Sequence, residues 1–358
     1  MIHEYAGNLH LHTVYSDGQA THDEVALAAI RAGLDFVVAT DHNIWVDGVD
    51  GYRYLGERRV LLLTGEEIHD PLLHPQRNHL LVYEARRELA TLASDPQALL
   101  DAVVQAGGFA FIAHPVDPAA PLFLQPSLPW TEWDVFGYAG LEIWNFMTEF
   151  KARLTSLPRA VYYAYRPDDI GRGPFPETSA RWNQLLNSGR KIFAIGGADA
   201  HAIPARMGPL SRTLFPYEFL FRSVNTHVLV EEPLTGEVER DRQILMHGLR
   251  DGQAFVGFDL PAPTRGFRFS ADGDGQAAGM GDVIRSRFGV TLRVHLPRRA
   301  DIRLLRNGET LRSWEDVQAV IFTTPEVGVF KVEASIYFKG RTRTWILSNP
   351  IFVEPWRR

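Results

Sequence analysis

The sequence predicts an α/β fold in which a mostly parallel sheet closes into a barrel, followed by a small antiparallel β-sandwich. Short apolar segments alternate with helical segments over the first part of the chain. This alternation is typical of parallel sheets covered by helices, and the number of units favours closure into a barrel. Beyond the linker Pro261-Ala262-Pro263 the helical pattern ends and short strands with turn signals take over.

The elements of the first part follow one another in a regular order. A strand at 5–11 precedes a helix at 21–32, with Thr21 as its cap and Glu24 three residues later as in a capping box. Gly33 is expected to end this helix. Insertions are expected near 117–190. Further strands are expected at 36–39, 60–68, 79–83, 109–113, 141–144 and 192–195, and further helices at 96–106 and 237–249.

The tail is expected to form a separate domain. Turn signals at Asn307-Gly308 and Lys339-Gly340 separate its strands, and it lacks helical periodicity. We therefore expect two domains, a metal-binding barrel over 1–262 and a sandwich over 263–358. The tail strands are expected at 289–296, 302–305, 319–322, 329–337 and 342–347.

The composition limits the functions that need to be considered. The 358 residues contain no cysteine, so a metal would have to be held by nitrogen and oxygen. A net charge of −6 disfavours a nucleic-acid polymer as partner. The first residues have no basic stretch leading into an apolar core, and no run approaches the length of a membrane span, so we expect a cytoplasmic protein.

Histidines and carboxylates gather at the ends of the predicted strands. Residues two apart on a strand share a face, so His10 can bind an ion together with His12, and Asp199 together with His201. Strand ends distant in sequence meet on one rim of a parallel barrel. Imidazole mixed with carboxylate suits zinc, manganese or iron, and this number of ligands allows two or three ions. The nine candidate ligands are His10, His12, Asp17, His42, Glu67, His79, His114, Asp199 and His201.

A series of motifs around these residues follows a known order. The motifs are Asn8-Leu9-His10-Leu11-His12-Thr13 with Ser16-Asp17-Gly18, Ala39-Thr40-Asp41-His42-Asn43, Gly65-Glu66-Glu67, Asn78-His79-Leu80, Ile112-Ala113-His114-Pro115 and Gly197-Ala198-Asp199-Ala200-His201. They resemble the motifs of the PHP family (polymerase and histidinol phosphatase). The resemblance implies a distorted (β/α)7 barrel with a trinuclear metal site.

The resemblance also implies which residues share an ion. One ion would take His10, His12, Glu67 and Asp199. A second would take Glu67 with His79 and His114. A third would take Asp17, His42 and His201.

The activity expected from this resemblance is metal-dependent hydrolysis. The first expectation is a phosphoesterase that acts on a small phosphorylated metabolite or nucleotide through a metal-bridging hydroxide. The segments 222–228 and 347–351 are similar to the carbaryl-hydrolase branch of the family, so a carbamate or carboxylic ester is the alternative substrate. A metal-binding regulatory protein without activity is a more distant alternative. No general acid is identified.

Other polar residues have weaker assignments. Glu142 is expected either to hold a ligand imidazole or to form a plain salt bridge. Arg181 and Arg206 are expected either to clamp a substrate anion or to be solvated at the surface. Glu66 is expected on the strand face opposite Glu67. His69 shares the face of Glu67 and is a further candidate, and the histidines outside the motifs are expected to be structural: His3, His22, His74, His227, His247 and His295.

Overall fold

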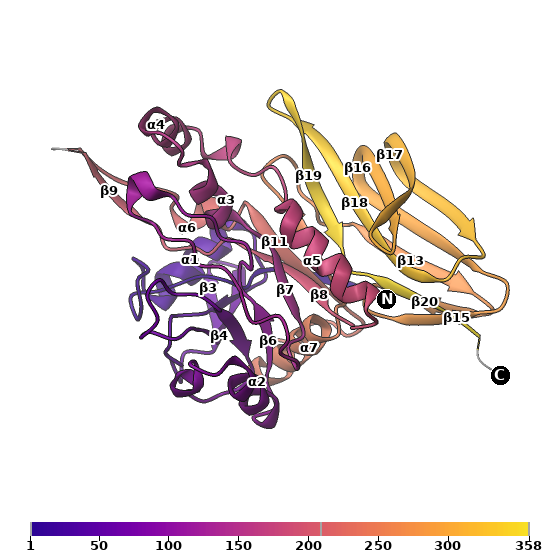
Figure 1. The fold of residues 1–358 in the computed structure, drawn as a ribbon, viewed down its shortest axis with the longest axis horizontal. Coiled ribbons are helices and arrows are strands. Elements are labelled where there is room, and N and C mark those ends of the chain that lie inside the picture. The colour runs from indigo at the N-terminus through magenta and orange to yellow at the C-terminus, as the bar shows by residue number, and fades with distance from the viewer. Residues whose placement is uncertain (1, 208–209, 357–358) are drawn as a thin grey trace.

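The computed structural model describes residues 2–207 and 210–356. Strands and helices mix in the first two thirds of the chain, and strands alone make up the tail that lies beside it (Figure 1). This is the sheet-rich α/β architecture that the sequence predicts. Among the described residues, no helix is long and apolar enough to cross a membrane.

Seven strands of the first part pair in an order that returns to its start. β1, β2 and β4 pair in parallel, as do β6, β7 and β8, whereas β5 runs antiparallel to both β4 and β6. A parallel bridge between Leu11 and Ala200 joins the segment after β1 to the segment after β8. The strands are β1 (His3–Asn8), β2 (Phe36–Ala39), β4 (Arg58–Ile68), β5 (Leu80–Tyr83), β6 (Phe109–Ile112), β7 (Gly140–Asn145) and β8 (Phe193–Gly197).

The three helices expected in the first part are confirmed to within a residue or two. Thr21 and Glu24 form the expected capping box of the first helix, and Gly33 ends it with a φ of 86°. The other helices, which follow β7, were not predicted. The helices are α1 (His22–Ala32), α2 (Pro96–Gln105), α3 (Phe146–Arg153), α4 (Leu157–Tyr165), α5 (Pro176–Asn187), α6 (Tyr217–Leu220) and α7 (Val238–Arg250), with short 3-10 turns at Ala90–Leu92, Pro121–Phe123 and Pro167–Asp169.

Further strands extend this sheet toward the tail. β11 (Val224–Val230) pairs antiparallel with β1, and β12 (Ala254–Phe258) pairs with β11. β12 also pairs with β19 (Arg341–Ser348) of the tail, so the two parts share backbone hydrogen bonds. Two smaller additions are β3 (Gly51–Leu55), which pairs with β4, and the separate pair of β9 (Pro204–Met207) and β10 (Leu210–Thr213).

The tail consists of strands joined by tight turns. Asn307-Gly308 and Lys339-Gly340 are two-residue turns in which all four φ angles are positive, which explains the glycines. The strands expected at 289–296 and 302–305 are in fact one long strand, β16, with register shifts inside it. The prediction of a purely antiparallel tail is wrong for one pair of strands, because β15 and β20 run parallel. The remaining strands are β13 (Arg268–Gly273), β14 (Gln276–Ala278), β15 (Val283–Ser286), β16 (Val290–Arg306), β17 (Glu309–Thr324), β18 (Gly328–Phe338) and β20 (Ile351–Pro355).

Two apolar cores stabilise these parts. One lies within the first part and the other within the tail. The border between them is shared, since Phe255 of β12 packs in the tail core while Leu347 and Phe352 of the tail pack in the first core. The buried Trp345 also donates a hydrogen bond to the linker carbonyl of Ala262, at 2.9 Å.

Candidate metal centre

The nine predicted ligands converge at one edge of the paired strands. His10, His42 and His114 follow β1, β2 and β6, and Glu67 lies near the end of β4. His79 precedes β5, and because β5 runs opposite to its neighbours its start lies at the edge where the other strands end. The apolar strands are buried, so their polar ends are held at fixed positions on this edge.

A single buried carboxylate, that of Glu67, is the centre of the cluster. One of its oxygens, Oε2, faces three imidazoles, and the other, Oε1, faces two. Five imidazoles around one carboxylate are far more than packing requires, because burying polar rings costs free energy. The distances are 2.9 Å to His10 Nε2, 3.1 Å to His12 Nε2 and 3.3 Å to His42 Nδ1 from Oε2, and 2.8 Å to His79 Nδ1 and 3.0 Å to His114 Nε2 from Oε1.

Asp199 adds a second carboxylate to the histidine pair after β1. Its Oδ1 lies 3.4 Å from His10 Nε2 and 3.2 Å from His12 Nε2. One potential ligand atom from each of these three residues and from Glu67 lies within 4.8 Å of all the others. This foursome is the set that the family resemblance implied for one ion.

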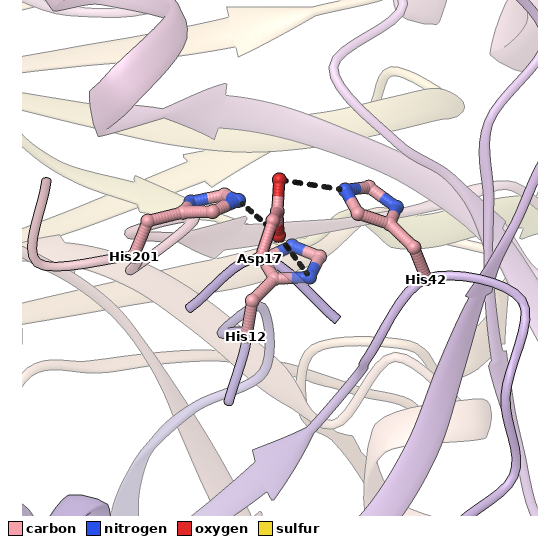
Figure 2. Close-up of side chains that lie close together, drawn as sticks. All are labelled: His12, Asp17, His42 and His201. Atoms are coloured by element: carbon pink, nitrogen blue, oxygen red, sulfur yellow. Dashed lines mark ion pairs between the residues drawn. The ribbon is translucent and has the colours of Figure 1, made fainter. Parts of the chain in front are cut away.

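Asp17 brings together a second foursome at the more exposed side of the cluster. Figure 2 shows its carboxylate between His201 and His42, with His12 below. Oδ1 lies 3.1 Å from His201 Nε2 and 3.8 Å from His12 Nδ1, and Oδ2 lies 3.8 Å from His42 Nε2. The grouping contains the predicted set of Asp17, His42 and His201, with His12 added.

The third grouping differs from the predicted one. It consists of His42, Glu67 and His79. His114, which was expected with Glu67 and His79, contacts Glu67 but is not in the group. His42 therefore belongs to two groupings, whereas His114 contacts Glu67 Oε1 at 3.0 Å without belonging to one.

The loop after β1 is shaped to carry Asp17. Asp41 accepts hydrogen bonds from the backbone and hydroxyl of Thr13, both at 2.7 Å, and from Ser16 Oγ at 2.6 Å. Gly18 packs against His12 so closely that a Cβ would lie 2.2 Å from the His12 carbonyl oxygen. Only glycine fits there, so Gly18 sets the approach of Asp17 to His12.

Glu142 contacts the cluster from β7. Its carboxylate lies 3.1 Å from His10 Nδ1 and accepts a hydrogen bond from the His114 backbone N–H at 3.0 Å. Asn145, which the sequence reasoning missed, donates to Glu142 at 2.9 Å and to Asp199 at 3.3 Å. Its side-chain oxygen caps α3 by accepting from Thr148 N. The position of Asn145 just before a helical segment, where asparagine is a common cap, was the sequence feature that could have identified it.

The carboxylates make positive charge favourable inside the cluster. Burial lowers the pKa of His12, but Asp199 and Glu67 outweigh burial and raise that pKa to about 9. Burial also lowers the pKa of His114, and Glu67 again outweighs it and raises the pKa to about 9. Burial would raise the pKa of Glu67, yet the surrounding histidines hold that pKa well below its ordinary value. The carboxylates therefore favour a positive charge at His12 and His114, whereas at His79 burial outweighs Glu67 and lowers the pKa to about 4.

These residues fit a divalent transition metal. Buried ring nitrogens of four histidines have no hydrogen-bond partner among the described residues: both nitrogens of His12, Nδ1 of His42, Nε2 of His79 and Nδ1 of His114. Such nitrogens are costly unless something binds them. Imidazole nitrogen with carboxylate oxygen is the donor set that zinc, manganese and iron accept.

A cavity of about 790 Å³ opens beside the cluster. Asp17, His42, Glu67 and Asp199 belong to its wall, and the rest of the wall comes largely from α3 and from the segments around 74–76 and 123–128. The sequence reasoning treated His74 as structural, but it lines this cavity. It also missed the ion pair of the buried Asp117 with the partly buried Lys151, at 2.7 Å.

The remaining candidates lie in different places. Arg181 is not brought to the cluster: it stacks on Trp133 and lines a separate cavity of about 330 Å³. Arg206 lies in β9, and its side chain is outside the described residues. Glu66 is buried near Glu88 on the other side of β4, and burial with Glu88 raises its pKa to about 9. His69 stacks on His79 with ring centroids 4.5 Å apart.

Comparison with known proteins identifies structures to which the chain is similar. No protein-family model matches the chain, and no curated protein matches its sequence. A solved two-domain protein of Bacteroides vulgatus, containing a predicted PHP-like metal-dependent phosphoesterase, shares 16% identity over 97% of this chain and 96% of its own, with a TM-score of 0.44.

Two other solved structures cover little more than half of the chain. A proposed metal-dependent phosphoesterase of Bifidobacterium adolescentis shares 17% identity over 56% of this chain and 90% of its own, with a TM-score of 0.31. An amidohydrolase of Chromobacterium violaceum with bound sulfate shares 16% identity over 59% and 92%, with a TM-score of 0.27. Such distant likenesses do not bear on activity, so the function must be argued from the cluster of side chains.

Proposed function

We propose that this chain is a metal-dependent hydrolase, and in the first place a phosphoesterase acting on a small phosphorylated molecule. The observation that carries the proposal is the buried Glu67 carboxylate in contact with five imidazoles. Asp199 and Asp17 complete this cluster at the wall of a cavity. A multi-carboxylate, multi-imidazole site at a cavity wall is typical of metal-assisted hydrolysis.

We further propose two domains and a barrel. The order of strand pairing, which returns from β8 to β1, supports a distorted (β/α)7 barrel in residues 1–262. The separate tail core supports a β-sandwich in residues 263–358.

The proposed centre binds two or three ions of zinc, manganese or iron. His10, His12, Glu67 and Asp199 would hold one ion. Glu67 with His79 and either His42 or His114 would hold a second, and the grouping around Asp17 a third, as follows from the contacts above. Bound divalent metals lower the pKa of water to about 7 and neutralise negative charge that develops on a phosphoryl or carbonyl oxygen.

The protein's own side chains orient this centre. Glu142 at His10 Nδ1 leaves Nε2 of that ring directed at Glu67 and Asp199. Burial of Glu67 and His10 excludes bulk water from the inner side of the site, while the more exposed Asp17 lies toward the cavity. The chain has no cysteine, so a thiolate nucleophile plays no part.

A carbamate or carboxylic ester is the second candidate substrate. The observation in its favour is the largely apolar wall of the cavity, which suits an uncharged body as well as a phosphorylated one. Assays on phosphate, carboxylate and carbamate esters that share one alcohol would distinguish these candidates. Turnover of carbamates without any phosphate ester would overturn the phosphoesterase assignment.

The site itself is tested by Glu67→Gln. The uncharged amide cannot bridge cations, so we expect loss of at least one metal equivalent per chain and a fall in hydrolysis of about 100-fold or more. Elemental analysis and steady-state assays measure both. Glu66→Gln is the matched control, because this neighbouring carboxyl faces away from the cluster. A wild-type protein that hydrolyses esters without bound metal would contradict the proposal.

A further inference from the structure

Away from the metal cluster, the wall of the cavity is mostly apolar. Its polar members there are His74, Gln76, Asp117, Gln125, Thr148 and Lys151. Met147 and Phe150 of α3 line it together with Leu154, the residue that follows this helix, and Phe123 and Leu128 of the preceding segment line the same cavity. A volume of about 790 Å³ far exceeds what a phosphate or carbamate group occupies, and falls in the range of cavities that hold drug-sized ligands. Most of the space is therefore available to the organic part of a substrate.

The charged side chains of the cavity wall do not favour a negative charge on the non-reacting part of a substrate. Of the wall side chains within the described part of the chain, the one lysine or arginine is Lys151. Its ammonium lies 2.7 Å from Asp117 Oδ2 and 2.6 Å from the Pro126 carbonyl oxygen. Because Asp117 neutralises Lys151, this lysine has little charge to offer to further phosphates. Beyond the metal cluster, a nucleoside polyphosphate would find no unpaired lysine or arginine on the described wall.

Apolar side chains continue outward from the cavity. Phe123 lines the cavity, and its neighbours Leu122 and Leu124 are exposed. Ala160 of α4 also lines the cavity, and Leu157 and Val161 on the same helix are exposed. Figure 1 shows α3, α4 and β9 at one end of the molecule. Scattered exposed leucines are ordinary, but a run of them beside a cavity indicates a surface that contacts apolar material.

The apolar wall is tied to the metal cluster through one residue. Asn145 caps the N-terminus of α3 and also donates to Glu142 and Asp199. The helix that supplies Met147 and Phe150, and leads directly to Leu154, therefore starts at the cluster. A group lying along this face would be held at a fixed distance from the reacting bond, which is how binding of a remote group can assist a reaction.

We propose that this cavity binds the non-reacting part of the substrate, and that this part is an uncharged alkyl or aryl group. The inference rests on the proposed hydrolase function, because it assigns the substrate class of the same site. The inference narrows the expected substrates from small phosphorylated molecules in general to phosphate esters of apolar alcohols.

A series of phosphate monoesters from methyl to hexyl tests the inference. The leaving alcohols have similar basicity, so chain length changes mainly the apolar contact. Each methylene that becomes buried is expected to raise kcat/KM about fourfold. Binding is measured separately by calorimetry with methylphosphonate and hexylphosphonate, which are not hydrolysed. The hexyl compound should bind at least tenfold more tightly.

Variants locate the effect in the cavity. Leu154→Glu should remove most of the preference for the hexyl over the methyl ester. Leu128→Gln should reduce the same preference, and it serves as the second test in case Leu154→Glu folds poorly. Val104→Glu is the control, since Val104 is exposed on α2 away from the cavity and should leave the preference unchanged. Melting temperatures check folding of each variant.

The two proposals fail in different ways. Equal kcat/KM for methyl and hexyl esters, together with equal or no binding of the two phosphonates, would overturn the apolar cavity and leave the hydrolase intact. Preferential binding of hexylphosphonate that Leu154→Glu abolishes, without hydrolysis of any ester, would support the cavity and overturn the hydrolase.

Discussion

At the scale of single residues, the cluster depends on side chains that orient other side chains. Glu142 is fully buried and touches both the His10 ring and the backbone of His114. An imidazole whose second nitrogen is held by a carboxylate is fixed in tautomer and direction, which makes it a better ligand. Glu142 is therefore a positioning residue in our proposal.

Glu142→Gln is expected to weaken metal binding about 10- to 100-fold. The amide keeps the size of the side chain but loses the charge that orients His10. Metal affinity, measured by competition with a chelating dye, is the readout, and the melting temperature of the metal-free protein should change little. Glu149→Gln is the control: Glu149 is also buried but pairs with Arg153 outside the cluster. Equal metal affinity in wild type and Glu142→Gln would exclude the positioning role.

At the scale of elements, strand ends and tight loops decide which ligands meet. Gly18→Ala would place a Cβ 2.2 Å from the His12 carbonyl oxygen, so the loop that carries Asp17 must move. We expect loss of about one metal equivalent by elemental analysis. Gly279→Ala is the matched control, since the nearest atom to its Cβ would be Asp282 Oδ2 at 3.6 Å. An unchanged metal content in Gly18→Ala would show that Asp17 binds no ion.

The contact of His227 in β11 with Glu4 of β1 and with Asp259, which follows β12, should depend on pH. His227 Nδ1 lies 2.9 Å from Glu4 Oε1, and its Nε2 lies 3.5 Å from Asp259 Oδ2. Burial lowers the pKa of His227, but Asp259 and Glu4 outweigh burial and raise it above its ordinary value of 6.5. Burial raises the pKa of Asp259, yet His227 outweighs it and brings the pKa to about 2.

These shifts define the pH window of the contact. Because the pKa of His227 is raised in the folded state, its contacts stabilise the fold fully below pH 6.5. This stabilisation is lost as the pH rises through the pKa of the folded state. Because the pKa of Asp259 is lowered in the folded state, its contact with His227 stabilises the fold fully above pH 3.8. This stabilisation is lost as the pH falls toward about 2. His227→Gln should therefore cost about 3 kcal/mol at pH 5.5 and clearly less at pH 9, by urea unfolding. The exposed His247→Gln should cost little at either pH, and a deficit that did not shrink at high pH would refute the ion pairing.

At the scale of the whole molecule, the tail supports the strand that leads to Asp199. The buried Asn349 accepts from Ala194 N at 2.7 Å and donates to the carbonyls of Ala194 and Ala254, both at 3.0 Å. Ala194 lies in β8 and Ala254 in β12. Together with the pairing of β12 and β19, this makes the two proposed domains interdependent.

Asn349→Ala should lower the free energy of unfolding by about 3 kcal/mol, because buried backbone groups of β8 and β12 lose their partners. Because the parts share hydrogen bonds, we expect a single cooperative transition in calorimetry. Asn187→Ala is the control, since its exposed amide donates to the tail carbonyl of Asn307 at 2.9 Å without supporting β8. Two separate transitions, with the variant affecting only the tail, would contradict the interdependence.

The sequence by itself determined the short-range features and the list of ligands. Capping residues, apolar periodicity and two-residue turns are local, so α1, α2, α7 and the hairpins at Asn307-Gly308 and Lys339-Gly340 could be predicted. Most of the nine ligands could be selected because they lie at the ends of apolar strands, whereas Asp17 in its loop and Glu67 beside Glu66 were selected with the help of the family motifs. That Glu142 stands near a ligand imidazole could be suspected, but the choice between His10 and a plain salt bridge could not be made from one strand.

The tertiary structure alone decided how these pieces combine. The reversed direction of β5, the position of His42 between two groupings and the pairing of β12 with β19 depend on contacts between distant segments, which local pattern does not encode. The same holds for the apolar cavity, whose wall comes from segments with weak periodicity. Asn145 and the Asp117–Lys151 pair acquired their importance only when folding brought them beside residues far away in the chain.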